Sequence, residues 1–267
     1  MNTVTLTVRK QPDLYLELEH LTPDTFAGKS AGEIAKLPVY MGKETDTIGD
    51  FFTVQGDAGA TARETAIIIN GDCTRMKYIG AKMTAGEVVV NSSCDMYTGS
   101  WMGGGKLTVN GNVNAFCGLA MKGGEFTISG SAGNYLGAAY RGDWRGMSGG
   151  VIRVRGNAGS DIASFMTGGT LIVEGSADIH IGTHMEGGTI IIRGNADRRV
   201  GGQMVRGTIC VFGTISVMMP GFTPVGDVEL EIDGTKAQFT DYIGDLGERH
   251  PKKKGEVVYG HLYLKKA

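Results

Sequence analysis

Seven copies of one thirteen-residue pattern occupy the middle of this 267-residue chain. Each copy reads G-x-x-M-x-x-G-x-φ-x-φ-x-G, where φ is Leu, Ile, Val or Phe. The copies span residues 80–92, 99–111, 118–130, 144–156, 163–175, 182–194 and 201–213. Most start 19 residues after the previous copy, and the fourth, which opens at Trp144, starts 26 residues after the third. A period near 20 residues is typical of a solenoid, so this repeat restricts the fold more than any other feature.

The contents of each copy indicate which solenoid to expect. Two apolar residues spaced by two, followed by a Gly-Asn, Gly-Ser or Gly-Asp pair, predict a short strand and a turn. No copy holds the 10–12 residues that a helix would need. We therefore predict an all-β fold: a single-stranded β-helix of about seven to eight 19-residue coils, with N- and C-terminal caps. Equivalent positions stack from coil to coil, so the methionines form a predicted core ladder of Met83, Met102, Met121, Met147, Met166, Met185 and Met204.

The flanking regions depart from the repeat. Residues 1–66 are a predicted N-terminal cap, with strands at 4–8, 14–18 and 51–54 and a short helix at 30–36 that Ser30 caps. Residues 67–221 form the predicted β-helix, beginning with an incomplete coil. Residues 222–267 are a predicted C-terminal cap or docking extension with strands at 228–232 and 257–263. Its lysine run at 252–254 is expected to be a solvated loop.

Composition narrows the function classes. Glycine makes up 44 of the 267 residues, more than twice its usual share of about 7%, and the repeat accounts for the excess. The formal net charge of −2 does not favour nucleic acid or a membrane surface as a partner. No apolar run reaches 18 residues, and residues 1–10 lack the apolar segment of a signal peptide. These observations predict a cytoplasmic protein.

Cysteine and histidine spacing gives no metal motif. Cys73, Cys94, Cys117 and Cys210 include no C-x-x-C pair and are expected to be free thiols, with Cys73 and Cys94 stacked in adjacent coils. His180 and His184 are expected to be surface or packing residues, because the repeat does not place them on one helical face. The glycine run at 103–105 lacks the G-x-x-x-x-G-K-[ST] pattern of a phosphate loop. The sequence therefore predicts no catalytic, cofactor-binding or metal-binding residue in this chain.

The one interruption of the repeat lies at residues 140–146. A departure from a regular array tends to mark a functional loop, and this one is rich in aromatic and arginine side chains, as interfaces are. The candidate interface residues are Tyr140, Arg141, Asp143, Trp144 and Arg145. We predict that they contact a partner protein or a cofactor; a passively tolerated loop is the alternative.

The seven copies, together with an insert that ends at residues 142–150, closely resemble the C subunit of formylmethanofuran dehydrogenase, of the tungsten or molybdenum type. The resemblance covers the array and extends upstream through residues 26–30. The wider superfamily includes the C-terminal β-helix domain of glutamate synthase and a subunit of the methylotroph formyltransferase/hydrolase complex. The departures are Ser92 at the end of the first copy, Trp144 at the start of the fourth and Ala163 at the start of the fifth.

The resemblance implies a non-catalytic scaffold subunit. The complex would reversibly reduce CO2 and attach it to methanofuran as formylmethanofuran, using reduced ferredoxin, as the first step of methanogenesis from CO2. Its implied partners are pterin-binding, amidohydrolase-like and polyferredoxin subunits, which would carry the tungsten or molybdenum pterin, a dinuclear metal centre and iron–sulfur clusters. The alternatives are the C subunit of the methylotroph complex and a stand-alone glutamate synthase-type domain.

Overall fold

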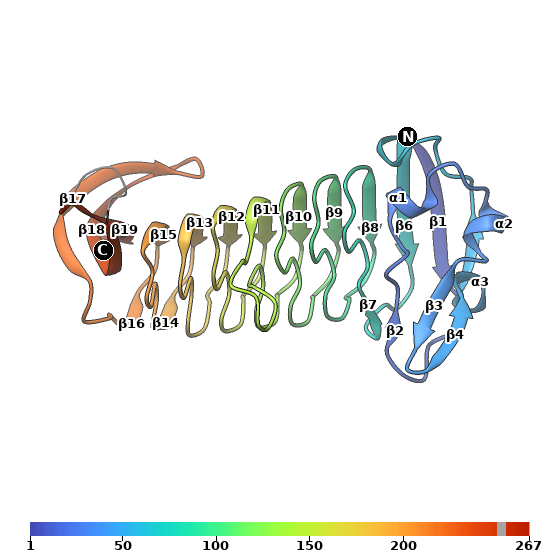
Figure 1. Cartoon of the computed structure of the whole chain (residues 1–267), viewed down its shortest axis with the longest axis horizontal. Coiled ribbons are helices and arrows are strands. Elements are labelled where there is room, and N and C mark those ends of the chain that lie inside the picture. Colours follow the sequence, from blue (N-terminus) through green and yellow to red (C-terminus); the bar gives the residue numbers. More distant parts are fainter. Residues whose placement is uncertain (250–254, 267) are drawn as a thin grey trace.

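The computed structural model describes residues 1–249 and 255–266 and shows an elongated, mostly β molecule with few and short helices (Figure 1). The strands are β1 (Asn2–Val8), β2 (Leu16–Glu17), β3 (Pro38–Met41), β4 (Glu44–Thr47), β5 (Phe52–Gln55), β6 (Thr65–Asn70), β7 (Met76–Lys77), β8 (Glu87–Val90), β9 (Lys106–Val109), β10 (Glu125–Ile128), β11 (Ser148–Val154), β12 (Gly168–Val173), β13 (Glu186–Ile192), β14 (Ala196–Arg198), β15 (Arg206–Val211), β16 (Ile215–Val217), β17 (Thr223–Ile232), β18 (Thr235–Arg249) and β19 (Val257–Lys265). The helices are α1 (Pro23–Phe26), α2 (Ala31–Ile34), α3 (Ile48–Phe51) and the 3-10 helix η1 (Ala62–Glu64).

A large, mainly parallel sheet runs the length of the molecule. Its strand order is β17-β18-β19-β15-β13-β12-β11-β10-β9-β8-β6-β1-β5. A four-stranded sheet, β4-β3-β2-β7, and a two-stranded sheet, β14-β16, complete the topology. The prediction of an all-β chain is confirmed. No helix in the described part of the chain has the length and apolar character needed to cross a membrane.

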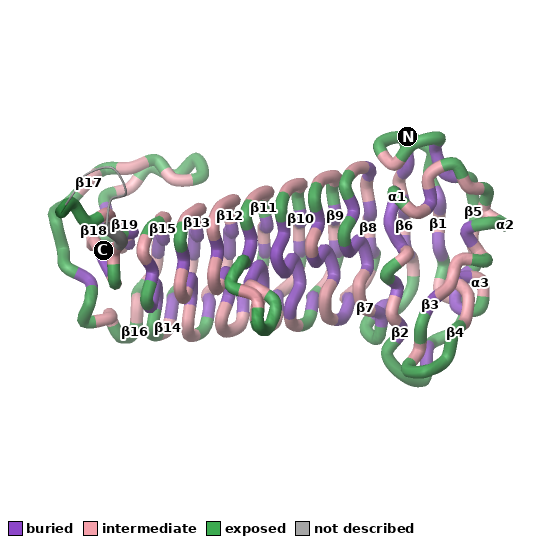
Figure 2. The backbone as a smooth tube through the Cα atoms, viewed as in Figure 1, coloured by how far each residue is buried: buried purple, intermediate pink, exposed green. Residues whose placement is uncertain are grey.

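Repeat copies pair residue by residue in the large sheet. Val88 of β8 lies opposite Leu107 of β9, and Leu107 lies opposite Phe126 of β10, so partners are 19 residues apart. Between β10 and β11 the offset is 26, as Phe126 pairs with Ile152. The two apolar residues of every copy are at most 1% exposed. Each repeat is one layer of the stack, which we call a rung, and Figure 2 shows a line of buried residues through successive rungs.

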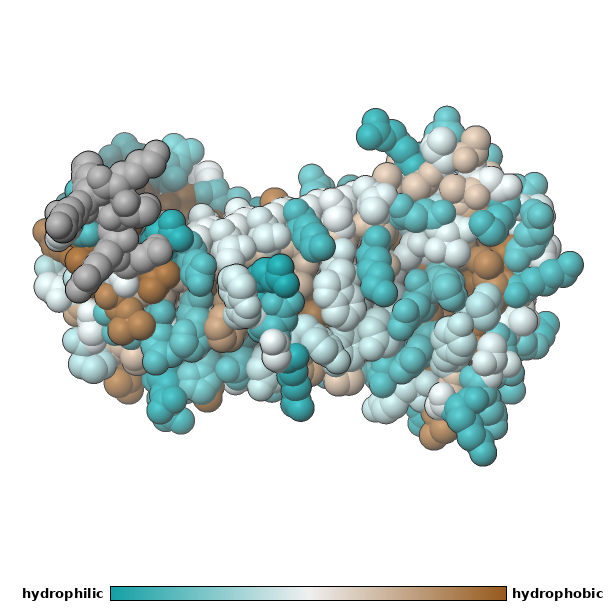
Figure 3. Space-filling model, viewed as in Figure 1, coloured by the Kyte–Doolittle hydropathy of each residue, from teal (hydrophilic) through white to brown (hydrophobic). Residues whose placement is uncertain are grey.

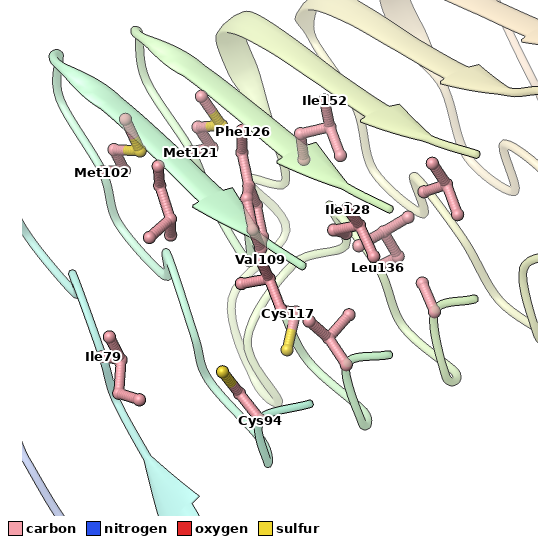
Figure 4. Close-up of a cluster of buried hydrophobic side chains, with 14 of the residues drawn as sticks. Ile79, Cys94, Met102, Val109, Cys117, Met121, Phe126, Ile128, Leu136 and Ile152 are labelled. Carbon is pink, nitrogen blue, oxygen red and sulfur yellow. The ribbon is translucent and has the colours of Figure 1, made fainter. Parts of the chain in front are cut away.

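Each methionine packs against the glycine of the following rung. Gly124 has a φ of +84°, and a Cβ built there would lie 2.7 Å from Cε of Met102 and 2.6 Å from the carbonyl oxygen of Gly105. Only glycine fits, because both the backbone conformation and the space exclude a side chain. The same pairing recurs at Met83–Gly105, Met102–Gly124, Met121–Gly150, Met147–Gly169, Met166–Gly188 and Met185–Gly207. The methionine and the glycine recur in every copy because the methionine of one rung contacts the glycine of the next. Figure 4 shows Met102 and Met121 within this core.

Short polar side chains follow the strands and connect one rung to the next. The backbone N–H of Ser131 donates to Oδ1 of Asn112 (2.8 Å), and the N–H of Asn157 donates to Oγ of Ser131 (3.1 Å). Ser176, Asn195 and Thr214 continue this series. The Gly-Asn and Gly-Ser pairs therefore satisfy turn N–H groups that the strands leave free.

The N-terminal region extends the ladder before the first copy. β1 pairs in parallel with β6, so Val4 and Leu6 continue the two apolar rows of the repeats. The predicted helix is present as α2, and Ser30 and Glu33 form the predicted capping box. The predicted strand at 14–18 is shorter than expected, because only Leu16–Glu17 pairs, with β3 and β7.

The C-terminal region extends the ladder at the other end. β19 pairs in parallel with β15, which places Leu262 opposite Ile209. β17 and β18 form an antiparallel hairpin that reaches back over the sheet (Figure 1). The predicted strands at 228–232 and 257–263 lie within β17 and β19. The lysine run at 252–254 lies outside the described residues.

At the hairpin turn, Asp233 accepts hydrogen bonds from Arg153 (2.9 Å) and Arg193 (2.9 Å to the backbone oxygen and 3.1 Å to Oδ2). Arg153 also pairs with Glu174 at 2.5 Å. These contacts fasten the hairpin to the outer face of β11 and to the residue after β13.

Candidate interaction surface

One corner of every rung carries an outward-facing side chain, and together these residues form what we name the corner row. Its members are Tyr78, Tyr97, Phe116, Tyr135, Asp161, His180 and Arg199. All have φ between +60° and +64°, a conformation that costs a non-glycine residue roughly 1–2 kcal/mol. Hydrogen bonds between rungs hold this conformation, such as Phe116 N–H to the carbonyl of Asn134 at 2.9 Å.

The first four members of the corner row form an aromatic stack. Ring centroids lie 4.8 Å apart for Tyr78–Tyr97, 5.3 Å for Tyr97–Phe116 and 4.7 Å for Phe116–Tyr135, with planes within 10° of parallel. Burial in the stack raises the pKa of Tyr78 to about 12 and also raises that of Tyr97. These phenols are therefore neutral at physiological pH. The aromatic residues recur every 19 positions, a signal in the sequence that our prediction from the repeats did not use.

The last three members are polar. Arg199 donates to Nε2 of His180 (3.2 Å), and Nδ1 of His180 lies 3.2 Å from Oδ1 of Asp161. Because arginine only donates hydrogen bonds, this geometry places the proton of a neutral His180 on Nδ1, facing Asp161. His184 lies elsewhere, stacked on Phe165 at 4.7 Å.

A second line of side chains, which we name the outer row, lies beside the corner row. It consists of Lys82, Trp101, Ala120, Ala139, Phe165, His184 and Gln203. Ala139 belongs to it by hydrogen bonding: its N–H donates to Ser164 as that of Ala120 donates to Ala138. Two consecutive alanines thus leave a gap between the rings of Trp101 and Phe165.

The insert lies over this gap. Tyr140 and Trp144 are 48% and 63% exposed, and the Tyr140 ring lies 6.0 Å from that of Trp101. Arg145 pairs with Asp143 at 3.3 Å and lies 5.5 Å over the Trp144 ring. The hydrogen bonds from Arg145 lower the pKa of the Asp143 carboxyl. The five predicted interface residues are therefore together in one surface loop.

The structure places the insert inside the fourth copy and not before it. Met147 N–H donates to the carbonyl of Gly137, as Met121 N–H donates to that of Gly118. Gly137 also has a φ of +65°, close to the +60° of Gly118. The counterpart of Gly118 is therefore Gly137, and the start at Trp144 is corrected to Gly137. The sequence pattern hid this because the insert separates the glycine from its methionine.

A cavity of about 420 Å³ opens under the insert. Its walls come from both rows and from the insert, and they include Tyr135, Phe165, Arg141, Asp143, Asp161, Ser164 and Thr183. Oγ1 of Thr183 is buried and has no hydrogen-bond partner within residues 1–249 and 255–266. A neighbouring cavity of about 420 Å³, lined by His180, Arg199 and Gln203, shares Thr183.

A third opening, of about 380 Å³, lies between the C-terminal hairpin and the sheet. Thr170, Thr189 and Thr208 line one side, and Ile172, Ile191 and Cys210 form a buried floor. Burial raises the pKa of the Cys210 thiol to about 12, so this thiol is protonated and a poor nucleophile at physiological pH.

The remaining residues singled out from the sequence lie inside. Met83, Met102, Met121, Met147, Met166, Met185 and Met204 are all fully buried. All four cysteines are free and buried, and the predicted stacking of Cys73 on Cys94 is confirmed by their parallel pairing. In the described chain, no three His, Cys, Asp or Glu side chains are grouped so that they could hold a metal ion.

On the face shown in Figure 3, hydrophobic residues gather at the C-terminal end of the molecule. Exposed apolar side chains from that end are Val217, Val225, Leu246, Val257 and Tyr259.

The curated proteins that resemble this chain in sequence are C subunits of formylmethanofuran dehydrogenases. No protein-family model matches the chain. It is 45% identical over 97 residues to the C subunit of molybdenum-containing formylmethanofuran dehydrogenase 1 from Methanosarcina barkeri, covering 36% of this chain and 32% of that protein. It is 46% identical over 97 residues to the C subunit of the tungsten-containing enzyme 2 from Methanothermobacter marburgensis, covering 36% of each. The matched segment thus spans about a third of these relatives.

A solved structure resembles the whole chain. It is a chain of the formyltransferase/hydrolase complex from Methylorubrum extorquens, crystallised with methylofuran, with a TM-score of 0.84 and 25% identity. The alignment covers 98% of this chain and 100% of that one. The resemblance predicted from the repeats is therefore confirmed: over 97 residues this chain is homologous to C subunits of formylmethanofuran dehydrogenases.

Proposed function

We propose that this chain is a non-catalytic scaffold subunit of a formylmethanofuran dehydrogenase complex, which reversibly reduces CO2 and attaches it to methanofuran. The observation that carries the proposal is the identity of 45–46% to the C subunits of the molybdenum and tungsten enzymes. The likeness over 98% of the chain to a component of a multi-subunit complex supports the same role.

The proposed fold is a single-stranded β-helix of about seven to eight coils, with residues 1–66 and 222–267 as its caps. The 19-residue offset between paired strands supports this proposal, as do the rows that continue from β1 to β19. The repeated side chains are used for packing between rungs, which is what a rigid spacer requires.

The catalytic groups would reside in other subunits. We propose that pterin-binding, amidohydrolase-like and polyferredoxin partners carry the tungsten or molybdenum pterin, the dinuclear metal centre and the iron–sulfur clusters, in the cytoplasm. This chain would contribute docking surfaces, of which the insert with Tyr140 and Trp144 is the leading candidate. Exposed aromatic side chains beside a cavity are typical of protein interfaces.

One observation favours a second candidate function. The whole-chain structural likeness is to the formyltransferase/hydrolase complex, so the chain could be the corresponding subunit of such a complex. That assembly would need no redox partner.

Affinity purification of the tagged chain from its native cells separates these functions. The proposal expects metal-pterin and iron–sulfur subunits to co-purify, with molybdenum or tungsten and iron in the eluate. A formyltransferase without redox subunits would instead establish the second candidate. A chain recovered alone would contradict both.

A further inference from the structure

We propose that the cavity under the insert binds the guanidinium group of an arginine from a partner subunit. This inference rests on the proposed scaffold function and identifies the chemistry of one docking contact. The cavity lies at the point where the corner row changes from aromatic to polar, and where two alanines interrupt the outer row.

The shape of the cavity suits a planar group. Trp101 and Phe165 are three rungs apart in the outer row, or about 14 Å at the usual strand spacing. Tyr140 occupies the Trp101 side of this gap at 6.0 Å between ring centroids. Phe165 is covered by His184 on one face at 4.7 Å, and its other face is turned toward the alanine rungs. A planar group can therefore stack on Phe165 beneath the insert.

The least exposed unused hydrogen-bonding groups of the cavity can accept, whereas the donors of Arg141 belong to an exposed residue. Oδ1 of Asp161 faces His180, whereas no hydrogen bond to Oδ2 is found within residues 1–249 and 255–266. Oγ1 of Thr183 is buried without a partner in the same part of the chain. Ser164 Oγ uses its proton on the backbone oxygen of Asp161, which leaves its lone pairs free. A hydrogen-bond donor therefore complements the inner wall of the cavity.

The charge of the cavity selects among donors. Asp143 and Asp161 line the cavity with Arg141. Because Asp143 is already paired with Arg145 and Arg141 is exposed, Asp161 supplies the negative charge of the inner wall. A carboxylate ligand would meet the half-buried Asp161, whose side chain is 29% exposed. Guanidinium is planar, stacks on aromatic rings and donates up to five hydrogen bonds in a fork, whereas ammonium has no flat face. The cavity therefore fits arginine better than lysine or an acidic residue.

The surroundings favour a protein as the source of this group. Tyr140 lines the cavity and is exposed, and Trp144 is exposed in the same insert; aromatic residues around a pocket that receives an arginine are typical of interface hot spots. The structurally similar chain from Methylorubrum extorquens belongs to a multi-subunit complex.

Binding to the full chain can be measured with N-acetylarginine amide as the probe, followed by amide chemical shifts in NMR spectra. N-acetylcitrulline amide, which has the same shape without the charge, and N-acetyllysine amide are the controls. We expect saturable binding of the arginine probe, with shifts at Phe165 and Thr183, at least tenfold tighter than either control. Equal binding of the three probes, or none, would overturn the inference.

Three variants test the assigned groups. Asp161→Asn should weaken the arginine probe about tenfold or more, because it removes a charged acceptor, whereas the distant exposed Asp13→Asn should not. Arg141→Ala should strengthen binding by a few-fold, since it removes a like charge. Weaker binding of the arginine probe by Arg141→Ala would show that Arg141 helps to hold the probe instead of repelling it, and would refute the proposal.

Probe binding and co-purification of the wild-type chain separate this inference from the proposed function. If the tagged wild-type chain co-purifies with complex subunits but does not bind the arginine probe, the cavity inference is wrong and the scaffold function stands. If the wild-type chain is recovered alone, the scaffold function fails whatever the probe does. With both intact, Asp161→Asn should lower the yield of co-purified subunits while Asp13→Asn leaves it unchanged.

Discussion

The inside and the outside of the repeat array follow the same period but differ in how much they vary. Inside, each of the seven copies repeats a methionine, a glycine and an apolar pair, and the methionines and the pairs are buried. Outside, the corner row begins with Tyr78 and ends with Arg199, and the rungs change from stacked rings to a polar series. The backbone is thus determined by the interior, and the exterior positions are free to differ without changing the fold. Substitutions on the two sides should therefore have unequal effects.

The largest effect is expected inside. Met121→Asp would place a charge in the core with no partner and should cost about 4 kcal/mol or more, preventing folding or lowering the melting temperature strongly. Circular dichroism during heating measures this. Its exposed neighbour is the control: Lys122→Asp should change stability by about 0.5 kcal/mol or less. Equal melting temperatures for the two variants would show that the methionine row does not support the fold.

A smaller effect is expected in the corner row. Phe116→Ala should cost about 2 kcal/mol in urea unfolding, because it removes two ring contacts and keeps the unfavourable φ of +61°. Phe116→Gly should cost roughly 1 kcal/mol less than Phe116→Ala, since glycine tolerates this φ. If alanine is the milder substitution, the strain assigned to the corner row is wrong.

The stabilisation that the hairpin turn gains from its contact with the outer face of β11 should depend on pH. Hydrogen bonds from Arg153 lower the pKa of Asp233 first, and those from Arg193 add to the shift. A carboxylate with a lowered folded pKa stabilises the folded state fully above its unfolded pKa of about 3.9, and this stabilisation is lost as the pH falls through the lower folded value.

Asp233→Asn should therefore cost about 1 kcal/mol at pH 7, because it removes a charged acceptor. It should cost little near pH 2. Urea unfolding of both proteins at several pH values measures the difference. A loss of stability by the variant that is the same at pH 7 and pH 2 would assign the effect to packing instead of charge.

The smallest effect on folding is expected at the insert. Trp144→Ala should change the free energy of unfolding by about 0.5 kcal/mol or less, since this side chain is 63% exposed. It should nevertheless lower the amount of co-purified subunits. A variant that assembles as well as the wild-type chain would leave the insert as a passive loop.

Much of this fold was predictable because periodic packing leaves a periodic sequence. The strand positions and the burial of the repeated residues follow from the 19-residue pattern. The place of β19 in the ladder was also visible in principle, because Gly260, Leu262 and Leu264 repeat the G-x-φ-x-φ spacing. It was missed because residues 214–256, which do not follow the repeat, separate it from the last copy.

Other features depend on contacts that no local pattern encodes. Asp233 binds Arg153 across 80 residues, and only the folded hairpin brings them together. The cavity under the insert likewise depends on the two alanine rungs, Ala120 and Ala139, and on the position of Tyr140 above them. Short spacing rules identify elements, whereas such sites arise from the way distant elements meet.

The pairing of each methionine with the glycine of the next rung has a consequence for how such a molecule can change in length. Removing a whole 19-residue unit would leave every remaining methionine facing a glycine, and the seven-residue insert, which keeps Met121 against Gly150, shows that extra residues in a loop do not disturb this match. The distance between the two ends can therefore change only in steps of one rung, about 4.8 Å each. Partner proteins bound at the two ends of the molecule are therefore held apart by a whole number of rungs.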